Sequence, residues 1–173
     1  MRGIALLSAA VVIVAGVVVT TTPAAKPADD EAAPAYVTSI PAGYRDWTLV
    51  SVAHEEGKLN SFAAVLGNDV AIKAYRAGTL PYPDGSIIAA LHYSHTASEE
   101  NDKAFGQPQS FVAGQPTNIQ FMVKDSKKYA ATGGWGFGHF SNGKAADAAF
   151  MKPCFPCHEQ IKARDLVFTR YAP

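Results

Sequence analysis

The sequence predicts an α+β domain that is rich in β-sheet and contains a few helices. Five short segments are enriched in β-branched and aromatic residues and are separated by Gly, Pro and Asn turn signals, as strands are. Two further segments have the periodicity or the composition of helices. Residues 36–173 have the length of one domain and can bury a core of their own.

The five predicted strands follow one another along the chain. The first follows the turn signal Pro41-Ala42-Gly43. The third follows Pro83-Asp84-Gly85, a turn in which Pro sets the first torsion and Gly permits a positive φ. The predicted strands are Trp47–Ala53, Ser61–Leu66, Ser86–Tyr93, Asn118–Val123 and Gly134–Phe140.

Two helices are predicted. Residues 69–77 carry apolar side chains at helical spacing, with Asn68 or Asp69 as the cap and Gly78 as the end. Residues 145–152 form the second helix, which leads into a cysteine motif. Residues 99–117 are expected to be a loop, because they contain Gly106, Pro108, Gly114 and Pro116.

The cysteine motif is Cys154-Phe155-Pro156-Cys157-His158, and it contains both cysteines of the chain. Two thiols separated by two residues and followed by histidine match the attachment signature of c-type haem. Each thiol adds to one vinyl group of the porphyrin, and the histidine becomes the axial ligand of the iron. The sequence therefore predicts one covalently bound haem c near the C-terminus, with Cys154 and Cys157 as attachment residues and His158 as iron ligand.

Three other interpretations of the motif remain open. A structural zinc site needs two more soft ligands, and the chain has no second cysteine pair. A thioredoxin-like pair would follow an early strand and open a helix rather than lie near the end of the chain. A plain disulfide would leave His158 without a role.

The N-terminus predicts export from the cytoplasm. Arg2, an apolar run over residues 4–19 and small residues up to Ala25 have the composition of a secretory signal peptide. Residues 1–25 are the predicted signal peptide and residues 26–35, rich in Ala, Pro and acidic residues, a disordered linker. An uncleaved membrane anchor is the alternative, although the run is short for a bilayer span. A periplasmic or secreted location, with no membrane contact after cleavage, is expected.

The charge balance gives no indication of a nucleic-acid partner. The chain has 15 basic and 15 acidic residues and a formal net charge of zero. A protein that binds nucleic acid or an anionic membrane surface usually carries a basic excess. We therefore expect neither as a partner.

Six short strings together resemble the cytochrome P-460 family, which includes the cytochromes c′-beta. They occur in this order: Gly43-Tyr44-Arg45-Asp46-Trp47, Tyr82-Pro83-Asp84-Gly85, Lys124-Asp125, Gly133-Gly134-Trp135-Gly136-Phe137, the Cys-x-x-Cys-His motif and Asp165-Leu166-Val167-Phe168-Thr169-Arg170. The resemblance covers nearly all of the chain after Tyr36. It implies a mainly antiparallel β-sheet, a homodimer, and a five-coordinate haem c whose distal face is open to small nitrogen ligands.

One residue departs from the hydroxylamine-oxidising members of that family. In those members a lysine on the strand after the Pro-Asp-Gly turn is cross-linked to the porphyrin. The matching position in this sequence is Ala90, which has no nucleophile. Ala148 and Ala149 likewise offer no carboxylate for proton transfer. The departure favours the c′-beta type, which is associated with nitric oxide binding.

For several other side chains the sequence allows two interpretations, a role in binding the cofactor or an ordinary structural role. Candidate sixth iron ligands are His92, His95, His139, Met122 and Met151. Candidates for an apolar distal cap are Phe62, Phe121, Phe137 and Phe140, and candidates for pairing with haem propionates are Arg45, Arg164 and Arg170. Of these, Phe137 and Arg45 are retained as cofactor-binding predictions.

The favoured function is binding or redox handling of nitric oxide, or a similar small nitrogen ligand, at a five-coordinate haem. The alternatives are an enzyme that oxidises hydroxylamine and an electron-transfer cytochrome c. If the protein is an enzyme, it is a haem oxidoreductase that acts on hydroxylamine or nitric oxide. A redox partner protein is a further expectation.

Overall fold

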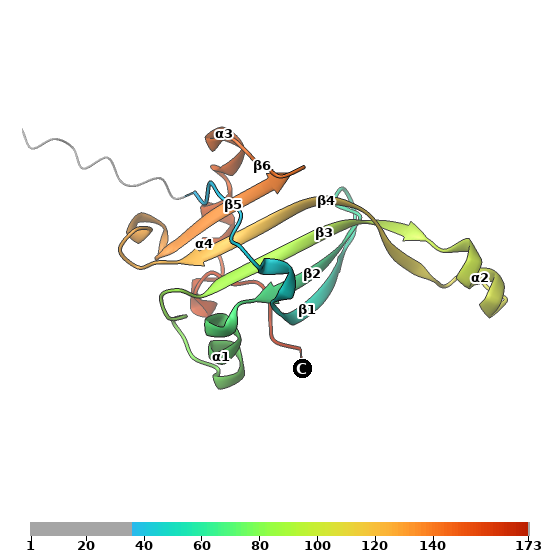
Figure 1. Cartoon of the computed structure of the whole chain (residues 1–173), viewed down its shortest axis with the longest axis horizontal. Coiled ribbons are helices and arrows are strands. Elements are labelled where there is room, and N and C mark those ends of the chain that lie inside the picture. The colour runs from blue at the N-terminus through green and yellow to red at the C-terminus, as the bar shows by residue number, and fades with distance from the viewer. Residues whose placement is uncertain (1–35, 173) are drawn as a thin grey trace, which may run out of the picture. The chain divides into compact units, whose positions relative to one another are not determined.

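Six strands form one antiparallel sheet, in the order in which they occur along the chain (Figure 1). The computed structural model describes residues 36–172, so the predicted signal peptide and linker lie outside the described residues. The strands are β1 (Thr48–Glu55), β2 (Ser61–Gly67), β3 (Ile87–Ala97), β4 (Phe111–Lys124), β5 (Trp135–Ser141) and β6 (Lys144–Ala145). The α+β fold with a mainly antiparallel sheet is confirmed.

Short helices lie between some of the strands and after the last strand. Helix α1 (Asp69–Ala77) begins at Asn68, whose side chain accepts a hydrogen bond from the Ala71 N–H, and ends at Gly78 with a φ of 63°. Both ends agree with the sequence prediction. The other helices are α2 (Glu99–Phe105), α3 (Ala148–Met151) and α4 (Cys154–Glu159), with 3₁₀ turns η1 (Tyr44–Asp46), η2 (Ala130–Thr132) and η3 (Lys162–Arg164).

The prediction of a loop over residues 99–117 was wrong. Ser98 caps α2 by accepting a hydrogen bond from the Asn101 N–H, and Asp102 accepts from the Gln109 and Ser110 N–H groups on the return to β4. Pro116 lies in β4 at a register irregularity opposite Tyr93. Gly114 also lies in β4. A side chain at this position would clash with the Ser94 and Thr96 hydroxyls, so only glycine fits there. These residues allow close strand packing rather than a turn.

The helix predicted over residues 145–152 is shorter than expected. Lys144 and Ala145 pair with β5 as strand β6, and Asp147 caps α3 by accepting a hydrogen bond from the Phe150 N–H. Ala145, the first residue of the predicted helix, therefore belongs to the sheet, and α3 contains only Ala148–Met151.

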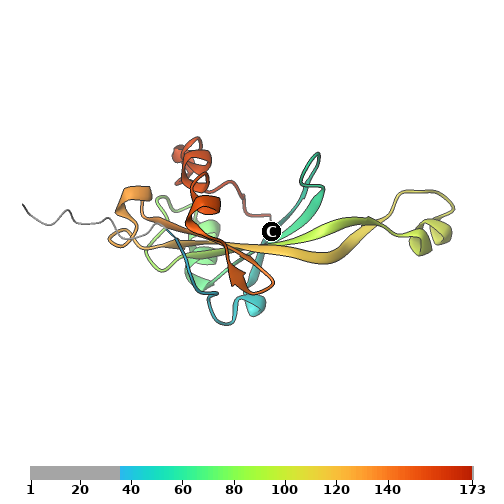
Figure 2. The same cartoon turned by 90° about the horizontal axis from the view of Figure 1, so that it is seen from above.

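Both faces of the sheet are buried, each by a different part of the chain. Helices α3 and α4 lie on one side and η1 on the other (Figure 2). On the side of the C-terminal helices, Met122, Trp135 and Phe137 pack with Leu166 and Val167. On the opposite side, Phe121 and Phe140 pack with Val37 and with side chains around η1. We call the first side the motif face.

The C-terminal residues 165–172, here called the C-terminal strap, are fixed to the sheet at both ends. Lys124 Nζ donates to Asp165 Oδ1 at 2.8 Å and to Asp165 Oδ2 at 2.9 Å, and the Tyr82 N–H donates to the same carboxylate at 2.8 Å. At the other end, the Ala172 N–H donates to the Val50 carbonyl. Asp165 and Leu166 adopt φ values of 50° and 66°, a left-handed conformation that persists only where surrounding contacts enforce it.

No helix in the part of the chain that the structure describes is long and apolar enough to cross a membrane.

The buried ion pair predicts a large loss of stability for Asp165→Asn. The side chains of Lys124 and Asp165 are only 6% and 13% exposed, and removing one charge of such a pair costs about 3–5 kcal/mol. Asparagine keeps an oxygen for the Tyr82 N–H, so the substitution isolates the charge. Urea denaturation measures the loss, with the exposed Glu159→Gln as a control that stays within about 0.5 kcal/mol of the parent. A loss for Asp165→Asn as small as that of the control would contradict the prediction.

Candidate haem site

Helix α4 presents the cysteine motif to the motif face. Cys154 and Cys157 are one helical turn apart, so their side chains lie on the same side of α4. Cys154 is half-buried and Cys157 is exposed, and neither forms a disulfide. Burial raises the pKa of the Cys154 thiol.

His158 is held by the C-terminal strap. Its Nδ1 lies 2.7 Å from the Leu166 carbonyl oxygen. A carbonyl only accepts hydrogen bonds, so Nδ1 carries the proton and Nε2 keeps its lone pair. Burial lowers the pKa of His158, although the Leu166 hydrogen bond opposes that shift. A neutral imidazole whose other nitrogen donates to a carbonyl is the usual state of a metal-binding histidine.

Two aromatic rings fix the plane of the imidazole. Phe137 lies with its ring centroid 4.9 Å from that of His158, and Phe168 lies at 5.0 Å in an edge arrangement. Phe137 comes from β5 and Phe168 from the C-terminal strap, so the sheet and the strap together set the direction of Nε2.

Cys154, Cys157 and His158 line one cavity of about 900 Å³. This volume is in the upper part of the range of about 300–1,000 Å³ for ligand sites. A second cavity of about 440 Å³ adjoins it, because both share Leu59, Asn118, Gln120 and His158. The other residues of the larger cavity are Phe121, Met122, Phe137, Gly138, His139, Ala149, Phe150 and Pro153.

Several apolar side chains around these cavities are exposed and would be buried by a large apolar ligand. Leu59, Phe150 and Phe168 are 67%, 56% and 48% exposed, and each lines one or both cavities. Contiguous exposed apolar side chains usually mark a binding surface. Ser61 Oγ is buried in the smaller cavity and has no hydrogen-bond partner among the described residues. The size, the apolar walls and the donor set all fit a haem.

The predicted sixth ligands are not brought together. Met122 and His139 line the larger cavity and His92 the smaller one. His95 instead stacks on His54 and Phe111 on the outer part of the sheet, and Met151 is buried in the core. His139 Nε2 lies 3.3 Å from Ser141 Oγ, and His92 Nδ1 lies 3.9 Å from Glu55 Oε2. Burial lowers the pKa of both His92 and His139.

The predicted aromatic and basic cofactor residues lie in different places. Phe137 lies at the centre of the site, while Phe62 and Phe140 line other cavities. Phe121 borders the larger cavity but buries its side chain in the opposite core. Arg45 stacks on Tyr44 in a separate cavity, and Arg164 and Arg170 line a third. Pairing of these arginines with haem propionates stays a prediction.

Sequence reasoning missed Leu59, Asn118, Gln120, Phe150 and Phe168 as lining residues. Asn118, Gln120 and Met122 alternate along β4, so the strand period placed them on one face, next to the predicted ligand Met122. Phe168 had no such signal, because the C-terminal strap has no regular structure.

The zinc interpretation of the motif gains no further ligands from the fold. Among the described residues, no group of three or more His, Cys, Asp and Glu side chains is arranged to hold a metal ion. The motif, the neutral histidine and the apolar cavity instead define a haem-binding protein built on a β-sheet.

A comparison with known families agrees with this class. Residues 41–169 match the family model described as Cytochrome P460. The chain therefore belongs to the cytochrome P460 family, a family of haem proteins. No curated protein matches the chain.

The geometry predicts that haem attachment depends on both thiols. Cys154→Ala or Cys157→Ala leaves at most one thioether bond, and the double substitution leaves none. Mass spectrometry of the mature parent protein should show the mass of one added haem, which survives denaturation. A mature parent protein that instead carries zinc, or a disulfide between the two cysteines, would contradict this prediction.

Proposed function

We propose that this protein is an extracytoplasmic haem c protein that binds nitric oxide, or a similar small nitrogen ligand, at a five-coordinate iron. Cys154 and Cys157 would hold the haem through two thioether bonds, and His158 would bind its iron. The bound haem supplies an iron with one free coordination position for the small ligand. In this proposal His158 is the protein ligand of the iron, and the apolar residues that line the cavity limit the access of water and larger ligands.

One observation carries the proposal: His158, whose Nδ1 is held by the Leu166 carbonyl so that Nε2 is unprotonated, lines an apolar cavity together with both cysteines. The Leu166 hydrogen bond fixes the tautomer, and Phe137 and Phe168 fix the ring plane. This arrangement makes His158 a strong ligand on one side of the iron without further adjustment.

The surroundings of the other candidate ligands favour a vacant sixth position. His92 and His139 each face another polar partner, Glu55 and Ser141. Met122 is 9% exposed and packs in the core of the motif face with Phe137 and Trp135. Each of these side chains would have to break its present contacts in order to bind the iron. An electron-transfer cytochrome, in which a side chain closes the sixth position, is therefore the less favoured alternative.

The position of Ala90 favours ligand binding over hydroxylamine oxidation. Ala90 lies in β3 opposite Val65 and Gln120, and it packs against the core of the motif face. Its side chain is therefore on the same side of the sheet as Met122 and His158. A lysine at this position would reach toward the cavity, whereas a methyl group supplies no bond to the porphyrin.

The periplasmic or secreted location, a homodimer and a redox partner protein are further parts of the proposal. The location rests on residues 1–25 and the homodimer on the family resemblance. Sedimentation of the mature protein measures the oligomeric state.

A vacant sixth position predicts a high-spin ferrous spectrum. The ferrous parent protein should bind carbon monoxide and nitric oxide without displacing a side chain. His158→Ala should lose the proximal bond while the thioethers retain the porphyrin, and optical and resonance Raman spectra detect this change. A low-spin ferrous parent that becomes high-spin in Met122→Ala, His92→Ala or His139→Ala would show that a side chain occupies the sixth position.

Ala90 predicts negligible hydroxylamine oxidation and an ordinary haem c spectrum. Ala90→Lys should bring an amine to the porphyrin edge and change the spectrum, while Ala90→Met provides a matched side chain without a nucleophile. Steady-state turnover with an electron acceptor measures the activity. Turnover of hydroxylamine by the parent protein well above that of free haem would make the enzyme interpretation correct.

A further inference from the structure

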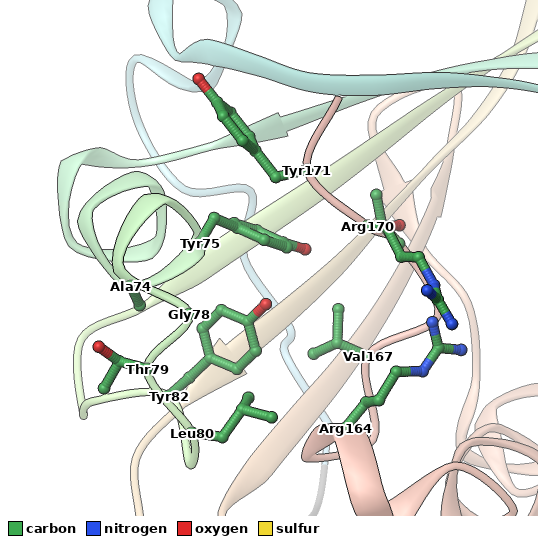
Figure 3. Close-up of a pocket in the computed structure, with 11 residues that line it drawn as sticks. Ala74, Tyr75, Gly78, Thr79, Leu80, Tyr82, Arg164, Val167, Arg170 and Tyr171 are labelled. Carbon is green, nitrogen blue, oxygen red and sulfur yellow. The ribbon is translucent and has the colours of Figure 1, made fainter. Parts of the chain in front are cut away.

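A separate cavity lies next to the C-terminal strap, away from the candidate haem site. It has a volume of about 190 Å³ and is formed by the C-terminal half of α1, the following loop and the C-terminal strap (Figure 3). The strap separates the two sites, because Phe168 faces the haem cavities whereas Val167 and Thr169 line this one. The volume is below the usual range of about 300–1,000 Å³ and fits a ligand of a few heavy atoms.

Positive charge gathers in this cavity without a carboxylate to balance it. Arg164 and Arg170 both line it, and no Asp or Glu is among its described lining residues. Neither guanidinium forms an ion pair within residues 36–172. The nearby Asp165 is bound to Lys124 and to the Tyr82 N–H. Of the donors of Arg164, one is directed to the Phe168 carbonyl at 3.1 Å, which leaves several others available.

A buried hydroxyl faces these two arginines. Tyr75 Oη is buried and forms no full hydrogen bond in the described part of the chain, although the Tyr82 hydroxyl lies near it. Burial raises the pKa of Tyr75 above its ordinary value, so the hydroxyl stays protonated. Figure 3 shows the Tyr75 and Tyr82 hydroxyls on the helix side of the cavity and both guanidinium groups across from them. A buried donor without a partner is costly, and a ligand that accepts its hydrogen bond removes that cost.

We propose that this cavity binds a small carboxylate anion. Guanidinium groups match the two oxygens of a carboxylate, and a tyrosine hydroxyl donates a further hydrogen bond to it. Ala74, Leu80 and Val167 supply an apolar wall for a methyl-sized substituent. Sulfate and phosphate have no apolar group that could be buried against this wall, so a short organic acid fits the cavity better than either ion.

The test is an NMR titration of the mature holoprotein with acetate, at an ionic strength kept constant with sodium chloride. The protein is in the ferrous carbonmonoxy state, so that the iron is not open to the anion. Saturable shifts of the Arg164 and Arg170 Nε–H signals and of residues 167–171 are expected. Shifts that do not saturate, or that map to the haem cavities instead, would overturn the proposal.

Two substitutions should weaken acetate binding while the fold is retained. Tyr75→Phe removes only the buried hydroxyl, and Arg170→Gln removes one exposed guanidinium. A hydrogen bond to a charged group is strong enough that each should raise the Kd about tenfold or more. Lys162→Gln is the control, because it removes an exposed cation of η3 that does not line the cavity, and it should leave the Kd within about twofold. Equal effects of Arg170→Gln and Lys162→Gln would indicate general charge attraction and would refute a built site.

Discussion

The buried ion pair between Lys124 and Asp165 anchors the segment that positions His158 in the candidate haem site. Lys124 ends the central strand β4, and Asp165 begins the C-terminal strap. A buried pair stabilises a fold only where further hydrogen bonds satisfy its remaining donors and acceptors. Here Lys124 also donates to the Gly133 carbonyl and lies over the Trp135 ring, and Asp165 also accepts from the Tyr82 N–H. The pair therefore links three separate segments at one point.

The geometry of His158 follows from this link. Asp165 and Leu166 are both left-handed, and for residues other than Gly such a conformation costs about 1–3 kcal/mol each. The anchored carboxylate of Asp165 and the buried side chain of Leu166 offset that cost. The resulting turn aims the Leu166 carbonyl at His158 Nδ1, which leaves Nε2 for the iron. An interaction in the core thus controls the protonation and direction of the proposed axial ligand.

The sequence predicted the local features well and the long-range ones less well. The capped helix α1, the turn before β3 and the attachment motif each depend on a few neighbouring residues, and they were readable. The length of β4 was not, because Gly114 and Pro116 look like turn residues until the opposite strand β3 is in place. The same limit applies to the site. His158 was predicted from the motif, but Leu166 and Phe168 contact it only in the tertiary fold, where Lys124 anchors the strap through Asp165.

The arginines illustrate the remaining difference. Arg164 and Arg170 were predicted as candidates for haem propionates, because a guanidinium group pairs with a carboxylate. The alternation of the C-terminal strap turns their neighbours Val167 and Thr169 away from the haem cavities, and both arginines line the other cavity. The sequence therefore identified both arginines as candidates for binding a carboxylate, whereas the cavity that they line is defined only by the tertiary fold.

A crystal structure of the mature holoprotein in the ferrous state tests the central claim most directly. The account predicts His158 Nε2 bound to iron, Nδ1 still hydrogen-bonded to the Leu166 carbonyl, thioether bonds to Cys154 and Cys157, and no side chain on the opposite side of the iron. A haem ligated by Met122, His92 or His139 on that side, or a His158 whose Nδ1 has left Leu166, would contradict it.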